Sequence, residues 1–202
     1  MGRKSLSRER KDKNKKVEQW TQALLSKLRT TELGDLTIDD LAKLMNKSKS
    51  TIYQYFVTKE EIFEYITQVR VDHLKAYKNE ISGELSGLNY QYETLAKILA
   101  EGVKDISPFY LKQLQIHYPC AWSIVEDFLQ GLLKDLKNFY VFGIENNMFT
   151  YVSPELLIKL DEYFIMQLIT DHTFFNNNQQ TLESAIKEYM YIKFEGLVIK
   201  HH

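Results

Sequence analysis

The side chains between residues 48 and 59 of this 202-residue chain could bind a polyanion. Hydroxyl, amide and ammonium groups crowd this stretch, almost without acids, and such groups bind phosphate oxygens and base edges. We predict base-edge contacts for Lys49, Ser50, Tyr53 and Gln54, and a glutamine can pair bidentately with adenine. The other candidates for contact with nucleic acid, phosphates above all, are Thr37, Ser48, Thr51, Tyr55 and Lys59.

Two short helices joined by a tight turn would present these side chains. Thr37 is a good N-cap for the first helix, in which apolar residues recur at helical spacing as far as Met45. Asn46 tolerates a positive φ and therefore suits the turn. Ser48 can cap the second helix, which we expect to run to Phe56. Two short helices with such a turn make a helix-turn-helix unit.

At these residues the chain resembles the DNA-binding domain of the tetracycline-repressor (TetR) family of bacterial regulators, over about residues 17–66. The family pattern is T, then I-A, then G-V-S-x-G-T-x-Y-x-Y-F-x-(S/T)-K-E-x-L. The matching residues are Thr37, Leu41, Ala42, Ser48, Thr51, Tyr53, Tyr55, Phe56, Lys59, Glu60 and Ile62. Asn46 replaces the turn glycine, Lys47 a usually buried valine, and Ser50 a glycine that often lies close to DNA.

Lys59 has two interpretations. Thr58 followed by Glu61 has the spacing of a capping box, so a helix should begin at Lys59. Free backbone N–H groups at that end favour an anion, and the resemblance implies a phosphate there. Without the resemblance, Lys59 would be an ordinary solvated lysine.

Composition predicts an all-α protein with a basic head and an acidic body. Hydrophobic residues make up 44% of the chain, with only 8 Gly and 3 Pro, which favours long helices over many strands and turns. Residues 1–60 hold 14 Lys and Arg against 8 Asp and Glu, whereas residues 61–202 hold 12 against 19. This asymmetry fits a head that binds a polyanion.

The chain divides into three parts: a basic arm over residues 1–15, a helix-turn-helix head over 16–62 and a helical body over 63–202. The arm lacks hydrophobic periodicity and should be disordered in isolation. It is either a solubilising tail or a DNA-binding arm that follows phosphates or enters the minor groove.

Helical periodicity and caps predict the remaining elements. Helices are expected over 16–29, 59–80, 91–104, 108–117, 121–146, 154–172 and 181–200, with a linker at 82–89 and a loop at 174–179. Gly34 should be free to take a positive φ after the first helix. Residues 143–149 resemble the family's G-x-x-x-G-x-F turn, with Asn147 at a usual glycine position.

The resemblance also implies a ligand pocket in the body and a homodimer formed through helices 154–172 and 181–200. The body is rich in aromatic residues and shows no strong excess of charge there, so we expect a small apolar or amphipathic effector. The expected lining residues are Tyr110, Leu114, His117, Trp122, Val125, Tyr163 and Gln167.

We find no constellation for catalysis, a metal or a cofactor. Nucleotide-binding glycine motifs and a nucleophile elbow are absent, no histidine spacing suggests a metal site, and Cys120 is the single cysteine. The chain shows no apolar run long enough to span a bilayer and no signal peptide, which predicts a cytoplasmic protein.

These observations predict a ligand-responsive transcriptional repressor that binds a palindromic operator as a homodimer. Two other classes stay open. The helical body could serve as an enzyme or small-molecule carrier with a vestigial head, which turnover or a bound cofactor would reveal. The chain could also be a protein-binding adaptor, which would be monomeric and without affinity for DNA.

Overall fold

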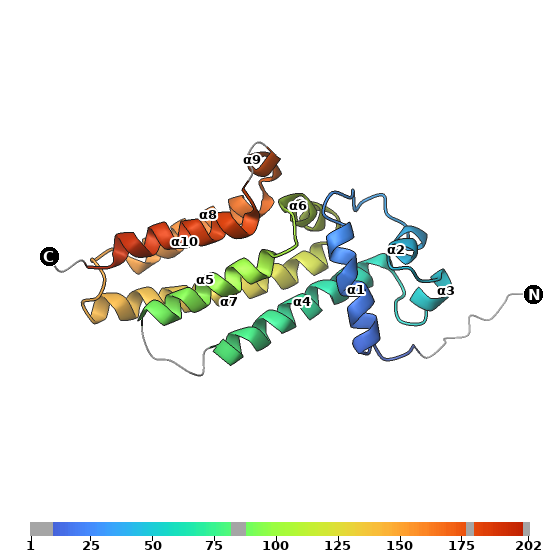
Figure 1. Ribbon diagram of the computed structural model, residues 1–202, viewed down its shortest axis with the longest axis horizontal. Coiled ribbons are helices and arrows are strands. Elements are labelled where there is room, and N and C mark those ends of the chain that lie inside the picture. Colours follow the sequence, from blue (N-terminus) through green and yellow to red (C-terminus); the bar gives the residue numbers. More distant parts are fainter. Residues whose placement is uncertain (1–9, 82–87, 177–179, 200–202) are drawn as a thin grey trace, which may run out of the picture.

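A computed structural model describes residues 10–81, 88–176 and 180–199, and these form an elongated all-helical molecule (Figure 1). Apart from one isolated bridge between Phe149 and Val198, the described ranges contain no β-structure, which confirms the predicted fold class. The helices are α1 (Lys15–Lys27), α2 (Ile38–Leu44), α3 (Lys49–Ile52), α4 (Lys59–Ile81), α5 (Leu88–Val103), α6 (Pro108–His117), α7 (Pro119–Glu145), α8 (Pro154–Thr170), α9 (His172–Asn176) and α10 (Leu182–Leu197).

The caps inferred for the head are present. Thr37 and Asp40 form a reciprocal capping box at α2, and the Ser48 hydroxyl accepts a hydrogen bond from the Thr51 N–H at α3. Asn46 has a φ of 53°, the left-handed conformation that its turn position requires. Lys47 is exposed, so a lysine is tolerated where the family usually buries a valine.

The head packs around a fully buried apolar centre. Helices α1 to α3 and the start of α4 contribute side chains such as Leu24, Leu41, Ile52 and Ile62. Trp20 closes this core, because its ring packs edge-on against Phe56 with centroids 6.1 Å apart. The predicted boundary between head and body, after residue 62, falls within the continuous helix α4.

Gly34 is required by a close contact and not by its backbone conformation. It has no positive φ. Instead, a Cβ added at Gly34 would lie 2.7 Å from the Cε1 atom of His117, so the imidazole occupies that space. The prediction of a left-handed glycine was therefore wrong, and the residue permits close approach between the head and the body.

Several helices end before the predicted residue, because hydrogen bonds of turns or side chains replace those of the helix at its end. The second helix of the head ends at Ile52 rather than Phe56, and single turns continue the chain to α4. α8 ends at Thr170, where the Asp171 carboxylate accepts the N–H groups of Thr173 and Phe174 and starts the unexpected α9. The predicted linker lies largely outside the described residues.

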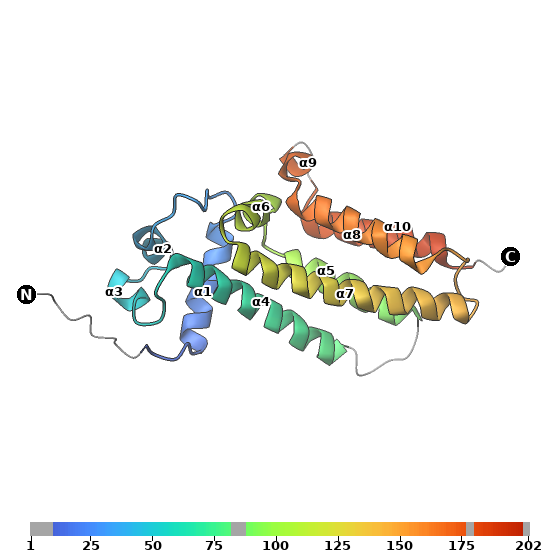
Figure 2. The ribbon, with the colours of Figure 1, turned by 180° about the vertical axis from the view of Figure 1, so that it is seen from behind.

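The body is layered, as the two opposite views show (Figures 1 and 2). α5 and α7 lie in the middle, with α4 on one side and the pair α8 and α10 on the other. α4 packs on α7 and α5, whereas α10 packs on α5 and α8 packs on α7. Because α4 runs from the head into this arrangement, a shift in the body can reach the head.

Asp161 of α8 is a buried carboxylate that joins three helices. It accepts hydrogen bonds from the hydroxyls of Tyr140 at 2.8 Å and Tyr189 at 2.7 Å, and it pairs with the Lys193 ammonium. Desolvation lowers the pKa of Lys193, and burial raises the pKa of both tyrosines. The network ties α8 to Tyr140 of α7 and to α10.

The turn after α7 depends on a close contact between a glycine and a ring. A Cβ on Gly143 would lie 2.1 Å from Cδ2 of the buried Phe149. Asn147 has a φ of 54° at the position where the family usually has glycine. The ring therefore lies directly on the glycine backbone.

We expect Gly143→Ala to lower the free energy of unfolding by about 1–3 kcal/mol, because the buried ring must move. Gly131→Ala is the matched control in the same helix, since its new Cβ meets nothing within 4 Å. It should instead stabilise the protein by about 0.5–1 kcal/mol through helix propensity. Urea unfolding of both variants tests this, and equal effects would contradict it.

Candidate functional site

The predicted nucleic-acid contacts lie at the N-cap of α2, along and directly after α3 and at the start of α4, at the end of the molecule farthest from α8 and α10 (Figure 1). We call the exposed residues of this set the recognition surface. It consists of Thr37, Ser48, Lys49, Ser50, Tyr53 and Gln54. Tyr53 is 48% exposed, which is high for a large aromatic side chain and leaves its ring available to a partner.

Hydroxyl groups cluster at the start of α3. The Ser48 Oγ atom lies 2.9 Å from the Ser50 Oγ atom and 2.8 Å from the Thr51 Oγ1 atom. Thr51 is half-buried, whereas the two serines are exposed. The cluster therefore presents hydroxyls that can both donate to phosphate oxygens and accept from base edges.

Lys49 is held across the two helices. Its ammonium donates a hydrogen bond to the Asp39 carboxylate of α2 at 2.8 Å, and this bond raises the pKa of Lys49. Both side chains are about half exposed, so the pair is weak and can open when a phosphate or base replaces the carboxylate.

The side chains of Lys59 and Tyr55 make contacts within the head. The Lys59 ammonium donates to the carbonyl oxygens of Gly34 at 3.0 Å and Leu36 at 3.2 Å. The Tyr55 ring packs edge-on against Trp20, with centroids 6.2 Å apart. Lys59 therefore fixes the loop between α1 and α2, and the phosphate contact predicted for it would require breaking these bonds.

Residues 10–14, assigned from the sequence to the arm, contact the head. The Lys11 N–H donates to the Gln54 carbonyl oxygen at 3.0 Å. The Lys13 ammonium lies 2.9 Å from a Glu61 carboxylate oxygen, and Asn14 caps α1. The prediction of disorder for residues 1–9 lies outside the described residues.

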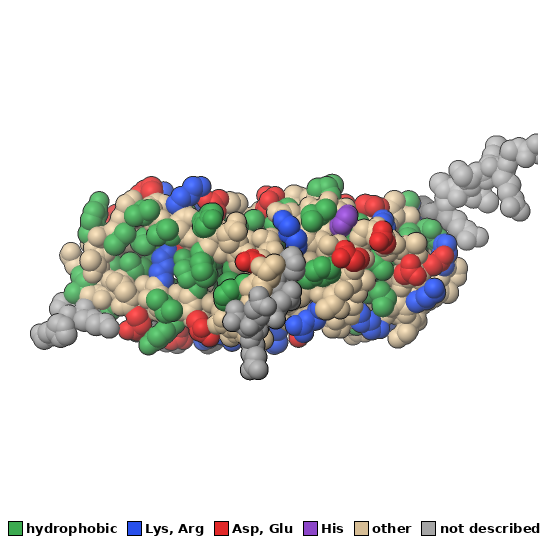
Figure 3. Space-filling view, turned by 90° about the horizontal axis from the view of Figure 1, so that it is seen from above, with side chains coloured by type: hydrophobic (Ala, Val, Ile, Leu, Met, Phe, Trp, Pro, Cys, Tyr) green, Lys and Arg blue, Asp and Glu red, His purple; other side chains and the backbone are tan. Residues whose placement is uncertain are grey.

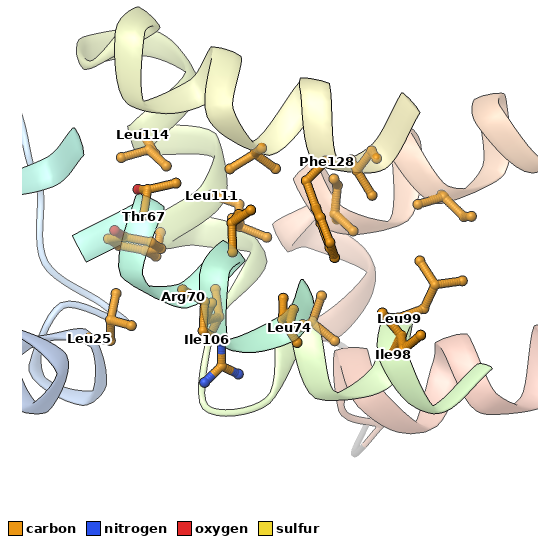
Figure 4. Close-up of a pocket in the computed structure, with 18 of the residues that line it drawn as sticks. Leu25, Thr67, Arg70, Leu74, Ile98, Leu99, Ile106, Leu111, Leu114 and Phe128 are labelled. Carbon is orange, nitrogen blue, oxygen red and sulfur yellow. The ribbon is translucent and has the colours of Figure 1, made fainter. Parts of the chain in front are cut away.

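The body contains a cavity of about 70 Å³ with an almost wholly apolar wall (Figure 4). Its wall comes from α1, α4, α5, α6, α7, α8 and α10 and the loop after α5, and includes Leu25 of the head. Among the predicted lining residues, Tyr110, Leu114 and Val125 do line it. The cavity is smaller than the few hundred Å³ of a typical ligand pocket.

Four predicted lining residues lie elsewhere. His117 packs against Gly34, and the indole N–H of buried Trp122 donates to Glu126 at 2.8 Å. Tyr163 and Gln167 are exposed on α8. The wall that sequence reasoning missed includes Thr67, Arg70 and Leu74 of α4, which read as an ordinary core face.

Few polar groups reach this cavity. Tyr110 is buried, its hydroxyl has no hydrogen-bond partner, and burial raises its pKa. Arg70 donates to the Lys104 carbonyl oxygen at 3.0 Å, and desolvation lowers its pKa. Figure 4 shows the Arg70 guanidinium turned away from Leu111 and Phe128. Tyr110 thus lines the apolar cavity and carries a buried hydroxyl donor without a partner.

α6 joins this cavity to the head. While Tyr110 lines the cavity, the Gln113 side chain accepts the Leu33 N–H at 3.2 Å, and the Tyr118 hydroxyl donates to the Leu33 carbonyl at 3.0 Å. Ser107 at the N-cap of α6 donates to the Arg29 carbonyl. Both backbone groups of Leu33 are therefore held by the body.

An apolar surface lies over α8 and α10. Figure 3 shows hydrophobic side chains gathered over this half of the molecule. The exposed residues of the two helices include Leu156, Leu160, Tyr163, Phe164, Tyr191 and Ile192. Large exposed apolar patches mark interaction sites.

Neither a metal-binding cluster nor a membrane-spanning helix occurs in the described part of the chain. No three His, Cys, Asp or Glu side chains there gather closely enough to hold a metal ion. None of the described helices is both long and apolar enough to cross a membrane.

The comparisons with known proteins point to bacterial transcriptional regulators. Residues 33–66 match the family model of bacterial regulatory proteins, tetR family. IcaR of Staphylococcus aureus (strain Newman), the negative transcriptional regulator of the biofilm operon icaADBC, is 30% identical over 111 residues. That match covers 52% of this chain and 58% of IcaR, so the chain spans little more than half of the relative.

Solved structures share the fold over almost the whole chain. The ketosteroid transcriptional regulator KstR2 of Mycobacterium tuberculosis has a TM-score of 0.65 at 16% identity and covers 94% of this chain and 98% of its own. The fatty acid degradation regulator FadR of Bacillus halodurans also has a TM-score of 0.65 at 16% identity, covering 90% and 96%. The family match falls on the helix-turn-helix unit that forms the recognition surface, so the head of this chain resembles the bacterial regulatory proteins of the tetR family.

Proposed function

We propose that this chain is a ligand-responsive transcriptional repressor that binds a palindromic operator as a homodimer. The observation that carries this is the recognition surface on α2 and α3, in a helix-turn-helix that matches the family. The second helix of such a unit enters the major groove, and its exposed side chains read base edges. Repression is supported by IcaR, whose name describes a negative regulator.

A homodimer would form through the apolar surface of α8 and α10. Operators with two-fold symmetry require a two-fold protein, and an isologous interface uses the same patch twice. Tyr163 is 70% exposed and Leu160 is 53% exposed, and both line a groove on α8. Such side chains are stabilised when a second copy covers them.

Leu160→Asp/Tyr163→Asp should convert the dimer to a monomer, because two carboxylates would be buried at the interface. Sedimentation equilibrium measures the mass, and operator affinity should fall with it. Ile116→Asp is the matched control, since Ile116 is 57% exposed on α6. A variant that stays dimeric would place the interface elsewhere.

The effector would bind in the body cavity. The apolar wall and the unpartnered Tyr110 hydroxyl favour a small neutral molecule with one hydrogen-bonding group. Because the cavity holds only about 70 Å³, a typical effector must push the helices of its wall apart. That wall includes Leu25 of the head, α4, and α6, which holds Leu33. The effector would thus favour a state with differently placed heads.

Tyr110→Phe should weaken an effector about five- to tenfold, the loss of one buried hydrogen bond. The measurement is a thermal-shift screen of small neutral molecules on the wild-type chain. Compounds that raise its melting temperature and release operator are then titrated into the variant. Equal affinity for both chains would place the effector away from the Tyr110 hydroxyl.

The proposed regulator is not an enzyme, acts in the cytoplasm and needs no cofactor or membrane. Its partners are operator DNA, a second copy and the effector. The experiment that tests it is a salt-dependent titration with the DNA upstream of its own gene. We expect site-selective binding by a dimer that weakens steeply with salt. Weak binding that is equal on random DNA would favour a carrier or adaptor instead.

A further inference from the structure

Asp39 is an acid beside a surface whose other side chains suit phosphates and base edges. Residues 37–59 contain two acids, Asp39 and Asp40. Asp40 completes the capping box with Thr37, so the start of α2 explains its presence. Asp39 takes no part in that box. Its exposed carboxylate would repel the phosphates of every DNA sequence, so its contacts on the recognition surface decide what it does there.

The Asp39 carboxylate is bonded to α3. Lys49, the first residue of α3, donates a hydrogen bond from its ammonium to the Oδ2 atom of Asp39 at 2.8 Å. The bond crosses from one helix of the helix-turn-helix to the other. Tyr53 follows Lys49 by four residues, so the two side chains are neighbours on one face. Lys49 is therefore restrained beside a residue for which we predict base contacts.

The chemistry of the restrained ammonium matches one base. A lysine ammonium has three N–H donors, and the bond to Asp39 uses one of them. The other two fit a base that presents two acceptors. In the major groove guanine does so with O6 and N7, whereas adenine and cytosine present a donor and thymine presents one acceptor beside a methyl group. The N-terminal residues of a recognition helix, such as Lys49, are those that contact base edges.

The same carboxylate disfavours contact between Lys49 and phosphates. A lysine is a compact charge on a flexible chain, and it can turn to a phosphate of any sequence. A phosphate must compete with Asp39 for the ammonium and is repelled by the carboxylate. Guanine can accept the two other N–H groups while the pair stays intact. Both members of the pair are about half exposed, so DNA that covers them removes water and strengthens their attraction.

We propose that Lys49 contacts a guanine in each half-site and that Asp39 is its positioning residue, which holds the ammonium toward the base and away from phosphates. This rests on the proposed operator binding. Specificity is a difference between two affinities, and Asp39 increases it by lowering the affinity for random DNA. The pair thus makes one G·C pair per half-site a requirement of the operator.

The test begins by selecting bound duplexes from random sequence with the full chain, which recovers the core. One G·C pair of each half-site should be required, and its replacement by A·T in one half-site should weaken binding about tenfold. 7-Deazaguanine at that position lacks the N7 acceptor and should weaken binding about fivefold. Inosine keeps O6 and N7 and lacks the minor-groove amino group, so it should bind like guanine.

Two variants separate the roles of the pair. Lys49→Ala should bind duplexes with any base pair at this position alike and keep its preferences elsewhere in the core. Asp39→Asn should also lose the guanine preference, but its affinity for random duplex should rise about three- to tenfold with a steeper salt dependence, because the released ammonium binds a phosphate. Melting temperatures establish that both variants fold.

Asp35→Asn is the matched control for charge. Asp35 is an exposed carboxylate of the loop before α2, four residues from Asp39. Its loss changes the net charge of the head equally and leaves the pair between Asp39 and Lys49 intact. The control variant should therefore keep the guanine preference of the full chain.

Three results would overturn this inference while operator binding stood. A guanine preference that survives Lys49→Ala would remove Lys49 from the bases. A preference that survives Asp39→Asn would leave Asp39 without a positioning role. Equal loss of the preference in Asp35→Asn would reduce the effect to net charge. If the full chain selects no core sequence at all, the proposed operator binding fails, and this inference fails with it.

Discussion

Asp161→Asn should lower the free energy of unfolding by about 3–5 kcal/mol, because it leaves the largely buried Lys193 ammonium without its counter-charge. Asp161 is fully buried and accepts bonds from Tyr140 and Tyr189 as well as pairing with Lys193. An asparagine oxygen carries no charge, and its amide hydrogens would face donors. Urea unfolding at one fixed protein concentration measures the loss, since a dimer's stability depends on concentration.

Asp127→Asn is the matched control, because Asp127 is an exposed carboxylate of α7. It should change the free energy of unfolding by less than about 0.5 kcal/mol. A second variant combines Asp161→Leu, Lys193→Met and the change of both tyrosines to Phe. It removes the ion pair together with the cost of desolvating its charges. Apolar replacement of a whole buried ionic network is often neutral or stabilising. If Asp161→Asn costs less than about 1 kcal/mol, the network does not hold α8 in place.

The features that sequence reasoning predicted correctly depend on a few neighbouring residues. Thr37 with Asp40, and Ser48 with Thr51, satisfy helix N-termini within one turn, so their caps can be recognised without knowing the fold. Asn46 has its positive φ because a tight turn demands it locally. Ser107 and Pro108 likewise mark the start of α6 at the predicted residue.

The features that sequence reasoning missed depend on distant parts of the chain. The cavity wall comes from seven helices and a loop, and nothing in the sequence of α8 says that Ile165 faces it while Tyr163 faces outward. Apolar residues lie on more than one side of that helix, so their helical spacing does not show which side faces the cavity. The hydrogen bonds from Lys59 to the loop carbonyls of Gly34 and Leu36 likewise join residues more than twenty positions apart, while its predicted phosphate contact stays a prediction.

Tyr53→Ala/Gln54→Ala should weaken operator binding by about 2–4 kcal/mol, which is roughly 30- to 1,000-fold. Both side chains are exposed beside α3, so their loss removes base contacts and leaves the head folded. The Lys11 bond uses the Gln54 backbone and survives the change. Fluorescence anisotropy on operator and on random duplex measures both affinities, with Tyr151→Ala as the matched control because Tyr151 is 80% exposed on the body.

The measurement on random duplex distinguishes lost base contacts from lost phosphate contacts. Phosphate contacts contribute equally on any sequence, so the double variant should lose far more affinity for the operator than for random DNA. An equal loss on both duplexes would mean that Tyr53 and Gln54 contact phosphates and that base readout belongs to Lys49 and Ser50. Full operator affinity in a correctly folded variant would remove α3 from the major groove and contradict the proposed orientation of the head on DNA.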